Sequence, residues 1–414
     1  MTAPSRIMYA LGARPNFVKM APVIAALRRR LPGCRHVLVH TGQHYDRMMA
    51  EVFIEELGLP EPDHMLGVGS GSHALQTARV MERIEPVIEC ERPDLVIVPG
   101  DVNSTLAVTL VAVKLGVRLA HLEAGLRSFD RTMPEEINRI VADEFSDHLL
   151  VHCQEAIDNL SREGIEPERV HFVGNTMIDT LVAMEPRFRA AGTARRLGLK
   201  PGGFLLVTLH RPALVDGPLL AVALDRLEAV ARELPVVLPA HPRTRRLMAG
   251  RRPTPNLHVL EPIGYLDFLS LQADAAAVLT DSGGVQEETT FLGVPCFTLR
   301  DNTERPVTVR LGTNTLLGLD PRRIDDILPA LARGCAARPA APPPGWDGKA
   351  AERVADVLCG GPAAGHGGAA SGNGGPAVGR GGPAVGRRCA PAPPMAKPSP
   401  AERRPVRPKF PVGG

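Results

Sequence analysis

Three acidic residues in the first half of the chain have the type and spacing that proton transfer needs. Asp101, Glu123 and Glu135 occur in Pro-Gly-Asp-Val-Asn-Ser-Thr, His-Leu-Glu-Ala-Gly-Leu-Arg and Met-Pro-Glu-Glu-Ile-Asn-Arg, respectively. Two of them follow neighbouring apolar runs and the third opens a helical stretch, so all three can point into one pocket. Crowded carboxylates raise one another's pKa, which suits general acid/base work near neutral pH. Alternatively, Asp101 caps a helix and Glu135 interacts with a helix dipole.

A second candidate site follows the apolar run 275–279. The segment 280–288 reads Thr-Asp-Ser-Gly-Gly-Val-Gln-Glu-Glu and leads from a buried strand into a helix. Free backbone N–H groups and the positive end of the helix dipole would form a pyrophosphate seat there, and Gly283 and Gly284 let a phosphate come close to the backbone. Glu288, one turn into the helix, is placed to accept hydrogen bonds from a ribose diol. The alternative is an ordinary strand–helix turn of an α/β protein.

Basic residues follow other apolar runs. Arg14 and Lys19 come after the first run, His210 and Arg211 after another, and His241 after a third. A solvated helix face explains Lys19 equally well, and a lone histidine is usually a satisfied polar residue. Several cations on one rim, however, favour an anionic ligand.

The elements that must position these groups alternate between apolar strand runs and helical patterns, with a first helix expected at about 18–30. Strands are expected at 7–11, 36–40, 94–98, 118–122, 204–208, 236–238, 257–260, 275–279 and 296–299. This βαβ pattern predicts an α/β protein with two doubly wound parallel sheets, in which ligands bind beyond the carboxyl ends of the strands. Since nearly every conspicuous polar residue follows a strand, we expect a cleft between two Rossmann-like halves. The glycine-rich stretch 67–72 follows no clear buried strand and is expected to be a connecting loop.

Length and charge narrow the class of protein. A chain of 414 residues with 44% apolar content is long enough for two buried cores. Residues 360–414 carry six Arg and two Lys against one Glu, a net charge of +7, which leaves −4 for the rest of a chain whose total is +3. That balance argues against a nucleic-acid partner. The seven scattered cysteines show no CxxC pair or Cys/His zinc spacing, so no metal is expected.

The absence of a recognisable targeting signal leads us to expect a cytoplasmic protein. No apolar run reaches the roughly 18 residues that a membrane helix needs, and no signal-peptide apolar region precedes the first motif.

After about Cys335 an Ala/Pro-rich stretch leads to Trp346 and a short helical run, Ala350–Leu358. From Gly360 onward the chain contains Gly-Gly-Pro-Ala-Val-Gly-Arg twice in tandem. Such a segment cannot bury enough apolar area to offset its ordering entropy, so it is expected to be disordered.

Several motifs occur in a fixed order and together carry a family resemblance. They are Gly12-Ala-Arg-Pro-Asn-Phe-Val-Lys-Met-Ala-Pro22, His40-Thr-Gly-Gln-His-Tyr-Asp46, Pro99-Gly-Asp101, Glu123-Ala-Gly-Leu-Arg127, Pro134-Glu-Glu-Ile-Asn-Arg139, Val173-Gly-Asn-Thr-Met-Ile-Asp179, Asp281-Ser-Gly-Gly284 and Arg300-Asp-Asn-Thr-Glu-Arg-Pro306. Over about residues 5–358 the chain resembles the non-hydrolysing UDP-N-acetylglucosamine 2-epimerases, which adopt the GT-B fold. The resemblance implies an N-terminal Rossmann-like domain (1–173, joined by helix 349–358), a C-terminal UDP-binding domain (174–345) and the disordered tail (360–414).

The resemblance also implies a reaction. UDP-N-acetylglucosamine and UDP-N-acetylmannosamine interconvert at C2 without a cofactor, which supplies precursors of surface polysaccharides. UDP is eliminated to give a 2-acetamidoglucal and then re-adds with C2 inverted. Inversion needs proton removal on one face and delivery on the other, hence at least two acid/base groups. Which carboxylate serves which face stays open.

Individual roles follow from the same resemblance. Asp101, Glu123 and Glu135 share the acid/base work, and His210 assists the departing diphosphate. Ser282, Gly283 and Gly284 hold the phosphates, Glu288 holds the ribose, and Phe268 lies against the uracil. Arg14 offsets charge on the leaving group, and Lys19 meets a phosphate. Bacterial members bind a second UDP-N-acetylglucosamine as an activator, at positions matched by Gln43, Glu136, Arg211 and His241. The chain departs from the family nearby, in Pro212-Ala-Leu-Val-Asp216 and at Asp46, which puts activation in doubt. A homodimer is expected.

Other functions stay open. An epimerase of a UDP-2,3-diacetamido uronic acid would share the Gly-Ala-Arg-Pro and Thr-Gly-Gln-His-Tyr-Asp motifs. A GT-B glycosyltransferase would use the same UDP seat but usually needs one base, whereas three carboxylates favour epimerisation. Hydrolytic epimerases typically carry an acidic or small residue where this chain has Arg14-Pro15. A UDP-sugar sensor without activity is disfavoured by the complete set of acid/base residues.

Overall fold

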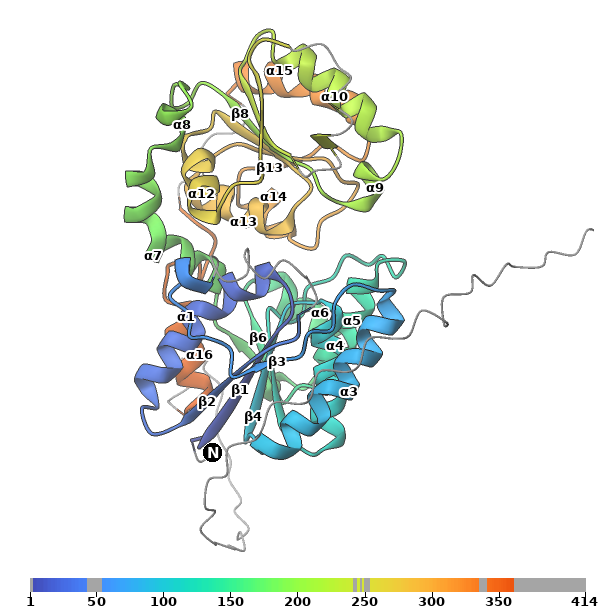
Figure 1. Cartoon of the computed structure of the whole chain (residues 1–414), viewed down its shortest axis with the longest axis vertical. Helices are drawn as coiled ribbons and strands as arrows, with labels where there is room; N and C mark the ends of the chain where they lie inside the picture. The colour runs from blue at the N-terminus through green and yellow to red at the C-terminus, as the bar shows by residue number, and fades with distance from the viewer. Residues whose placement is uncertain are drawn as a thin grey trace, which may run out of the picture. The chain divides into compact units, whose positions relative to one another are not determined.

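The structure is a computed structural model, and it describes residues 3–42, 54–240, 244–245, 248, 254–334 and 341–360. The tail that is predicted to be disordered, apart from Gly360, lies outside these residues. The described chain forms two parallel sheets with helices packed against them (Figure 1). The sequence prediction of an α/β protein with two doubly wound parallel sheets is therefore confirmed.

The first sheet has seven strands in the order β3-β2-β1-β4-β5-β6-β7, all paired in parallel. Its strands are β1 (Arg6–Leu11), β2 (Arg35–His40), β3 (His64–Met65), β4 (Leu95–Pro99), β5 (Arg118–Leu122), β6 (His148–Val151) and β7 (Val170–Phe172). Its helices are α1 (Arg14–Arg30), α3 (His73–Glu91), α4 (Asn103–Lys114), α5 (Pro134–Phe145), α6 (Gln154–Arg162) and the 3-10 turn η1 (Pro167–Arg169).

The second sheet has six parallel strands in the order β10-β9-β8-β11-β12-β13. Helix α7 (Thr176–Ala191) leads from the first sheet towards it. The strands are β8 (Leu205–Thr208), β9 (Val236–Pro239), β10 (Leu257–Leu260), β11 (Ala277–Thr280), β12 (Cys296–Thr298) and β13 (Asn314–Leu316). The helices are α8 (Thr193–Arg196), α9 (Pro212–Val215), α10 (Leu219–Val230), α12 (Tyr265–Asp274), α13 (Gly283–Leu292), α14 (Pro306–Arg310), η2 (Pro321–Asp326) and α15 (Ile327–Ala332). The last helix, α16 (Ala350–Leu358), returns to the first sheet.

Every strand expected from the sequence is present within one or two residues at most ends, but four strands escaped prediction. β3, β6, β7 and β13 are two to four residues long, too short to show a period among polar neighbours. β3 occupies His64–Met65, where no clear strand was expected. The stretch 67–72 that follows it is a loop, as predicted.

Helix α1 begins at Arg14, four residues earlier than expected. Pro15 suits the first turn of a helix because it has no N–H group to leave unpaired. The Asn16 side-chain oxygen accepts hydrogen bonds from the backbone N–H groups of Gly12 (3.1 Å) and Ala13 (3.0 Å), which fixes the turn out of β1. The early start places Lys19 near the carboxyl ends of the strands rather than on a solvated face, since it is only 7% exposed.

The last helix packs into the core of the first sheet. Residues of α16 share a hydrophobic cluster with β1 and α1, and Figure 1 shows α16 beside α1. Asp179 of α7 caps this helix by accepting hydrogen bonds from the backbone N–H groups of Ala350 (3.1 Å) and Ala351 (2.7 Å). The buried Trp346 donates its indole N–H to the backbone oxygen of His152 at 3.2 Å. The segment from Trp346 to α16 is therefore part of the packed structure.

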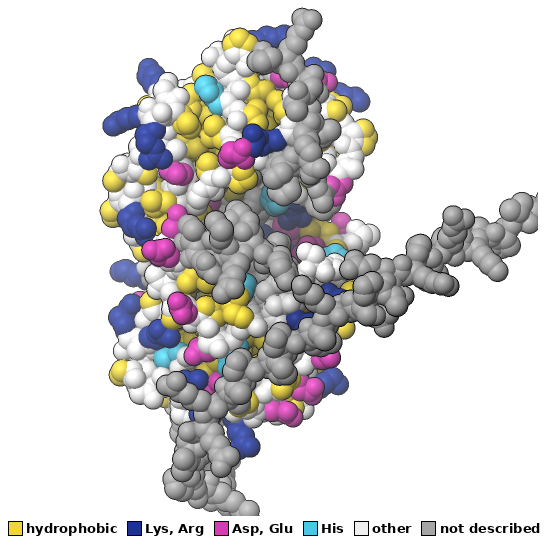
Figure 2. Space-filling model, in the orientation of Figure 1, with side chains coloured by type: hydrophobic (Ala, Val, Ile, Leu, Met, Phe, Trp, Pro, Cys, Tyr) yellow, Lys and Arg dark blue, Asp and Glu magenta, His cyan; other side chains and the backbone are white. Residues whose placement is uncertain are grey.

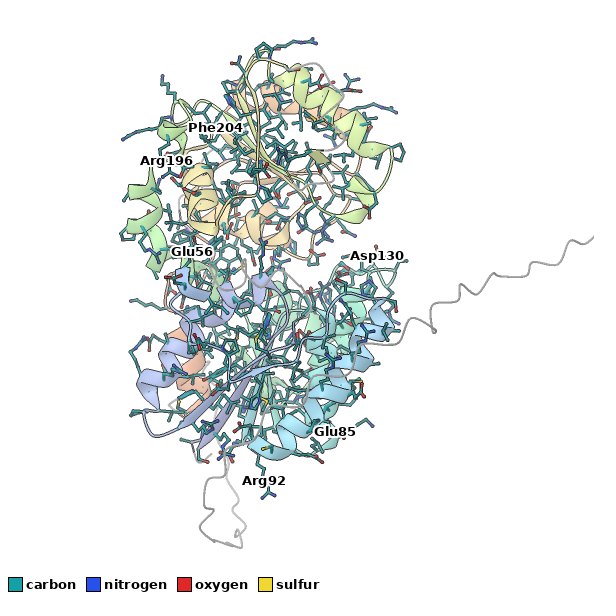
Figure 3. All side chains as sticks on the ribbon, in the orientation of Figure 1. Glu56, Glu85, Arg92, Asp130, Arg196 and Phe204 are labelled. Atoms are coloured by element: carbon teal, nitrogen blue, oxygen red, sulfur yellow. The ribbon has the colours of Figure 1, made fainter. Side chains whose placement is uncertain are left out.

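The surface is mixed in charge. In the face shown in Figure 2, basic and acidic side chains are interspersed among apolar ones, with no single-sign field over the residues drawn in colour. Charged side chains such as Glu85, Arg92 and Asp130 lie at the periphery, whereas Phe204 is fully buried within the second sheet's core (Figure 3). Within the described ranges, no helix is both long and apolar enough to cross a membrane.

Candidate active site

Two of the predicted acids stand at the carboxyl ends of adjacent strands. Asp101 follows β4 and Glu123 follows β5, and the two strands pair directly. Glu135 lies in the first turn of α5. Glu123 has a φ of 71°, a left-handed conformation that is unusual for a residue with a side chain. Such strain at a turn is typical of a residue whose side chain must point in one particular direction.

Glu123 is held between two cations. Lys19 Nζ forms an ion pair with Glu123 Oε2, and Arg305 Nη2 lies 2.5 Å from Glu123 Oε1. Burial alone would raise the pKa of Glu123, but Lys19 and Arg305 together lower it below its ordinary value. Glu123 is therefore ionised in this arrangement.

Asp101 is also paired with a cation. Arg139, one turn into α5, forms ion pairs with both Asp101 and Glu136. Its pKa is raised because the nearby carboxylates outweigh the effect of burial. The expectation that the acids crowd one another and raise one another's pKa is wrong for Glu123, because Lys19 and Arg305 lie on either side of its carboxylate.

A set of buried charges from the second sheet completes this network. Glu287 of α13 lies 3.1 Å from both Arg305 Nε and His152 Nε2. Burial would raise the pKa of Glu287, but Arg305 and His152 lower it to about 2. Arg300 binds Glu304 through two hydrogen bonds of 3.0 and 2.6 Å, and Arg305 lies 3.5 Å from the same carboxylate. Positive and negative groups thus alternate from Lys19 through Glu123 and Arg305 to Glu287.

The predicted phosphate seat has the expected backbone. β11 ends at Thr280, Ser282 occupies the N-cap position and α13 starts at Gly283. A Cβ atom placed on Gly283 would collide with the guanidinium of Arg305, whereas one on Gly284 would lie 3.0 Å from Met177 Cε. The Arg305 guanidinium therefore leaves no room for a side chain at Gly283. The sequence did not indicate this reason for the glycine.

His210 and Arg211 are attached to the same turn. Asp281 Oδ2 accepts both of their backbone N–H groups at 2.8 Å, and His210 Nδ1 lies 2.8 Å from Asp281 Oδ1. Arg211 donates through Nε to the backbone oxygen of Asp281 at 3.0 Å and lies 3.8 Å from Glu304. Burial would raise the pKa of Asp281, but His210 and the two backbone N–H groups lower it. The turn after β8 is thereby fixed beside the start of α13.

Glu288 and Phe268 lie on the packed α12–α13 side of the second sheet. Tyr265 donates its hydroxyl to Glu288 Oε1 at 2.7 Å, and the Gln272 amide reaches the other oxygen at 3.1 Å in its better orientation. Burial raises the pKa of Glu288 to about 7. Phe268 is half-buried against the hydrophobic cluster beneath α12. Both side chains therefore have structural partners in addition to the nucleotide contacts predicted for them.

The structure describes two of the four predicted activator-site residues, Glu136 and Arg211. Gln43 and His241 lie outside the described residues, as does Asp46. Glu136 is buried and accepts hydrogen bonds from Ser128 N and Oγ (both 2.9 Å) and from Phe129 N (2.8 Å), so it holds a loop in place. Arg211 lies beside Asp281. Arg14, predicted to offset charge on the leaving group, is exposed in the first turn of α1.

Sequence reasoning assigned no role to several residues that dominate the site. Arg305, Glu304 and Glu287 are all buried, and each contacts another charge there. A signal was available: Arg300-Asp-Asn-Thr-Glu-Arg-Pro306 follows the strand β12, at the same sheet edge as the other polar residues. The segment was recognised as a motif without a function.

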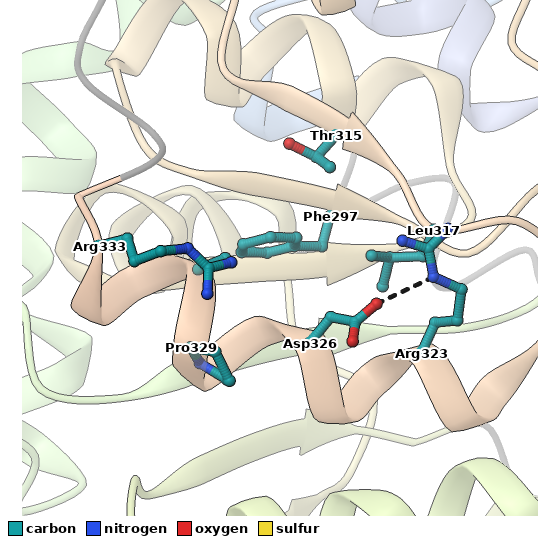
Figure 4. Close-up of a pocket in the computed structure, with 8 residues that line it drawn as sticks. Phe297, Thr315, Leu317, Arg323, Asp326, Pro329 and Arg333 are labelled. Carbon is teal, nitrogen blue, oxygen red and sulfur yellow. Dashed lines mark hydrogen bonds and ion pairs between the residues drawn. The ribbon is translucent and has the colours of Figure 1, made fainter.

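Cavities occur both at the site and away from it. A small one of about 10 Å³ is lined by Lys19, Glu123, His152 and Asn175, among others, and has room for one water molecule. A larger one of about 450 Å³ lies at the β12–β13 edge, lined by Phe297, Thr315, Leu317, Arg323, Asp326, Pro329, Ala330 and Arg333 (Figure 4). The one acid that lines this cavity, Asp326, is bonded to Arg323 at 2.9 Å. The cavity therefore lacks the acid/base groups that follow β4 and β5. In the described part of the chain, no group of three or more His, Cys, Asp or Glu side chains could hold a metal ion.

Known proteins resemble the chain over most of its length. The sequence pattern of the UDP-N-acetylglucosamine 2-epimerase family matches residues 26–359. The UDP-N-acetylglucosamine 2-epimerase of Methanococcus maripaludis is 41% identical over 332 residues, which cover 77% of this chain and 89% of that protein. The UDP-2,3-diacetamido-2,3-dideoxy-D-glucuronate 2-epimerase of Pseudomonas aeruginosa is 43% identical over 318 residues, covering 76% and 88%.

A solved structure extends the likeness to three dimensions. The crystal structure of Methanocaldococcus jannaschii UDP-GlcNAc 2-epimerase, in complex with UDP-GlcNAc and UDP, superposes with a TM-score of 0.76 at 37% identity. The alignment covers 86% of this chain and 100% of that one. The two parallel sheets accordingly form a GT-B fold, as expected. The chain belongs to the UDP-N-acetylglucosamine 2-epimerase family and is an epimerase.

Proposed function

We propose that the chain interconverts UDP-N-acetylglucosamine and UDP-N-acetylmannosamine by elimination and re-addition of UDP. The observation that carries the proposal is the set of three carboxylates around the ends of β4 and β5, with the Ser282–Gly284 turn opening the facing helix. Family membership and the M. jannaschii complex with UDP-GlcNAc and UDP support a nucleotide-sugar substrate.

The proposed steps are balanced in protons and electrons. One carboxylate accepts the C2 proton while the C1–O bond breaks and UDP leaves with that electron pair, giving a 2-acetamidoglucal. A second group then delivers a proton to the opposite face of C2, and the UDP oxygen re-forms the bond to C1. Asp101, Glu123 and Glu135 are proposed for these transfers, because they are the predicted acids that the fold carries to this edge.

The remaining residues are proposed to bind the nucleotide and offset its charge. His210 would assist the departing diphosphate, with Ser282, Gly283 and Gly284 at the phosphates. Glu288 and Phe268 would hold the ribose and uracil, and Arg14 and Lys19 would offset negative charge on the leaving group. Preorganised cations and N–H groups of this kind stabilise the charge that develops on a leaving group.

A second substrate is favoured by one observation. The P. aeruginosa relative, which is named for a 2,3-diacetamido uronate, is about as similar to this chain as the M. maripaludis relative is. The same site would then epimerise C2 of a sugar that also carries a C6 carboxylate. Comparing kcat/KM for the two UDP-sugars decides between these candidates, and we expect UDP-N-acetylglucosamine to be the better substrate.

Proton exchange tests the chemistry directly. Incubation with UDP-N-acetylglucosamine in deuterated water should place deuterium at C2 of both UDP-N-acetylglucosamine and UDP-N-acetylmannosamine. NMR of the C2 position measures this exchange. Asp101→Asn, Glu123→Gln and Glu135→Gln should each lower turnover by about 10²- to 10⁴-fold while UDP still binds. Glu85→Gln, on the exposed face of α3, is the matched control and should keep normal turnover. Near-normal turnover in all three site variants would overturn the proposed acid/base roles.

Three further expectations accompany this proposal. We propose a homodimer, which light scattering on a sizing column would test. We propose that the protein works in the cytoplasm and supplies surface polysaccharide synthesis, which cell fractionation and polysaccharide analysis of a deletion strain would test. Activation by a second UDP-N-acetylglucosamine predicts sigmoidal kinetics in the direction that consumes UDP-N-acetylmannosamine, relieved by added UDP-N-acetylglucosamine.

A further inference from the structure

A buried histidine lies directly behind the two strand ends that carry the proposed acids. His121, on β5, is 0% exposed and precedes Glu123 by two residues. Its Nδ1 lies 2.7 Å from Asp143 Oδ1, and its Nε2 lies 2.7 Å from the backbone oxygen of Gly100. Gly100 is the residue immediately before Asp101. The ring therefore connects helix α5 to the turn after β4.

The partners of His121 hold the ring at both of its nitrogens. A backbone oxygen can only accept, so Nε2 must donate to Gly100. Asp143 Oδ2 accepts hydrogen bonds from Arg127 Nη1 (2.7 Å) and from the backbone N–H of Gly125 (3.0 Å). Burial would raise the pKa of Asp143, but His121 and Arg127 hold it below its ordinary value. Since Asp143 Oδ1 lies against Nδ1, the ring cannot turn without losing a bond on each side.

This buried cluster is bonded to both turns that carry acids. His121 holds the carbonyl of Gly100, one residue before Asp101, and Asp143 holds the N–H of Gly125, two residues after Glu123. Three residues of these two turns have positive φ: 62° at Gly100, 71° at Glu123 and 78° at Gly125. A conformation that is strained at Glu123 persists only when surrounding contacts fix it.

A purely structural role is the competing explanation, because Arg127 also binds Glu163 through bonds of 2.7 and 2.5 Å and so anchors the cluster to α6. An apolar residue could fill the same volume at lower cost, since buried ion pairs contribute little net stability. What an apolar residue could not do is bond to both turns at once. That distinction favours a role in positioning.

We propose that His121 is a positioning residue whose ring, held by Asp143, locks the Gly100–Asp101 turn against the Glu123–Gly125 turn and so sets the placement of two acid/base carboxylates. The inference rests on the function proposed above for Asp101 and Glu123. A displacement of about 1 Å in a reacting group can lower a rate about 100-fold, so loss of the lock should affect catalysis more than binding.

The test is a split between kcat and KM. His121→Gln can keep one of the two hydrogen bonds but lacks the rigid ring that reaches Asp143 and Gly100 at once, and Asp143→Asn removes the anion. Each should lower kcat about 10- to 100-fold, with KM for UDP-N-acetylglucosamine changed by no more than about twofold and UDP affinity by calorimetry unchanged. Because the two residues act as one unit, the double variant should have the kcat of the weaker single variant.

His148→Gln is the matched control. His148 is likewise buried, lies on the adjacent strand β6, and contacts His171 at 3.3 Å rather than either acid-bearing turn. It should lower the melting temperature to a similar degree while keeping kcat per folded molecule. If His121→Gln keeps wild-type kcat, or loses no more kcat than this control, the positioning role is wrong.

Nitrogen-15 NMR of histidine-labelled wild-type protein, assigned through loss of the signal in His121→Gln, tests the bond to Gly100 itself. Nε2 of His121 is expected to carry a proton, because the Gly100 carbonyl can only accept. A bare Nε2 at His121 would overturn the inference. Failure of the proposed function is recognised separately, because it would appear as normal turnover in Asp101→Asn and Glu123→Gln.

Discussion

At the scale of single residues, the candidate site is defined by ion pairing more than by exposed reactive groups. Glu123 contacts Lys19 on one oxygen and Arg305 on the other, and these cations come from different sheets of the fold. Two cations in a poorly solvated site keep the carboxylate ionised and ready to accept a proton. A charged substrate bound near Lys19 and Arg305 would change these two ion pairs. The charge state of Glu123 therefore depends on what is bound beside it.

Removing Arg305 should move the acid limb of the rate profile. The pKa of Glu123 lies below its ordinary value in the folded state, so its stabilising effect is present above the unfolded pKa and is lost as the pH falls through the folded one. Arg305→Gln removes one of the two cations and should raise the pKa of Glu123, shifting the acid limb of kcat/KM to higher pH. Arg305→Lys keeps the charge and serves as the control. An acid limb at the same pH in both variants would contradict this assignment.

Glu288 should make nucleotide binding depend on pH. Its pKa is raised to about 7 by burial. Only the ionised form can accept both hydroxyls of a ribose diol, so affinity for UDP should increase as the pH rises through about 7. Calorimetric titration with UDP between pH 5.5 and 8.5 measures the trend, and Glu288→Gln should abolish it. A wild-type affinity that is flat over this range would argue against a ribose contact.

The same shift has the opposite sign for stability. A carboxyl whose folded pKa lies above its unfolded value holds its proton more tightly in the folded state. Stability is therefore greatest below the ordinary pKa of 4.5 and declines as the pH rises towards about 7. Urea titrations at several pH values should show that Glu288→Gln removes this decline in stability. If the decline persists in Glu288→Gln, other titrating groups cause it.

At the scale of elements, the predictable part of the site is its position in the fold. Short polar segments after β4, β5, β8 and β11 could be read from the sequence, because a parallel strand is an apolar run that ends abruptly. That rule placed Asp101 and Glu123 at the carboxyl ends of strands in the first sheet, and the Ser282 turn at the carboxyl end of a strand in the second. It also located α16, whose apolar period and bounds were predicted from the sequence.

The pairings between elements could not be predicted. Glu136 was expected at an activator site, but in the structure it accepts hydrogen bonds from Ser128 and Phe129 on a loop eight residues earlier. Glu123 was expected to share charge with other acids, but Lys19 lies 104 residues away in sequence and Arg305 182 residues away. A single sequence gives the types of these residues, and only the packing of distant segments decides which of them meet.

The turn from β11 into α13 is expected to tolerate no side chain at its first helical residue. In Gly283→Ala the new methyl group would displace the Arg305 guanidinium and block the approach to the helix N-terminus. UDP affinity should fall about tenfold or more, since each kcal/mol lost from a phosphate contact changes affinity about fivefold. Calorimetry measures the loss.

Two other glycines provide comparisons for this variant. Gly284→Ala meets only the end of the flexible Met177 side chain and should cost less. Gly217→Ala has no heavy atom within 4 Å of its new methyl group and should bind UDP normally. Normal UDP affinity in Gly283→Ala, with the fold intact, would remove the phosphate seat from this turn.

At the scale of the whole molecule, the packed structure closes on its C-terminal segment. Helix α16 belongs to the same hydrophobic cluster as β1, the first strand of the chain. Trp346 is completely buried and bonded to His152, which also lies 3.1 Å from Glu287 in the charge network of the site. The last described residues thus support both the first sheet and the environment of the acids.

Cutting the chain at two points should therefore give opposite results. Truncation after Gly360 removes a segment with a net charge of +7 and few apolar residues at helix or strand period, so the melting temperature and turnover should stay nearly unchanged. Truncation before Trp346 removes a fully buried indole and the apolar face of α16, and loss of one large buried side chain alone typically costs about 3–5 kcal/mol. Thermal melts and steady-state epimerisation of both truncated proteins measure the contrast. If the longer protein lost activity while the shorter one kept it, the boundary between the folded enzyme and its tail would have to move beyond Gly360.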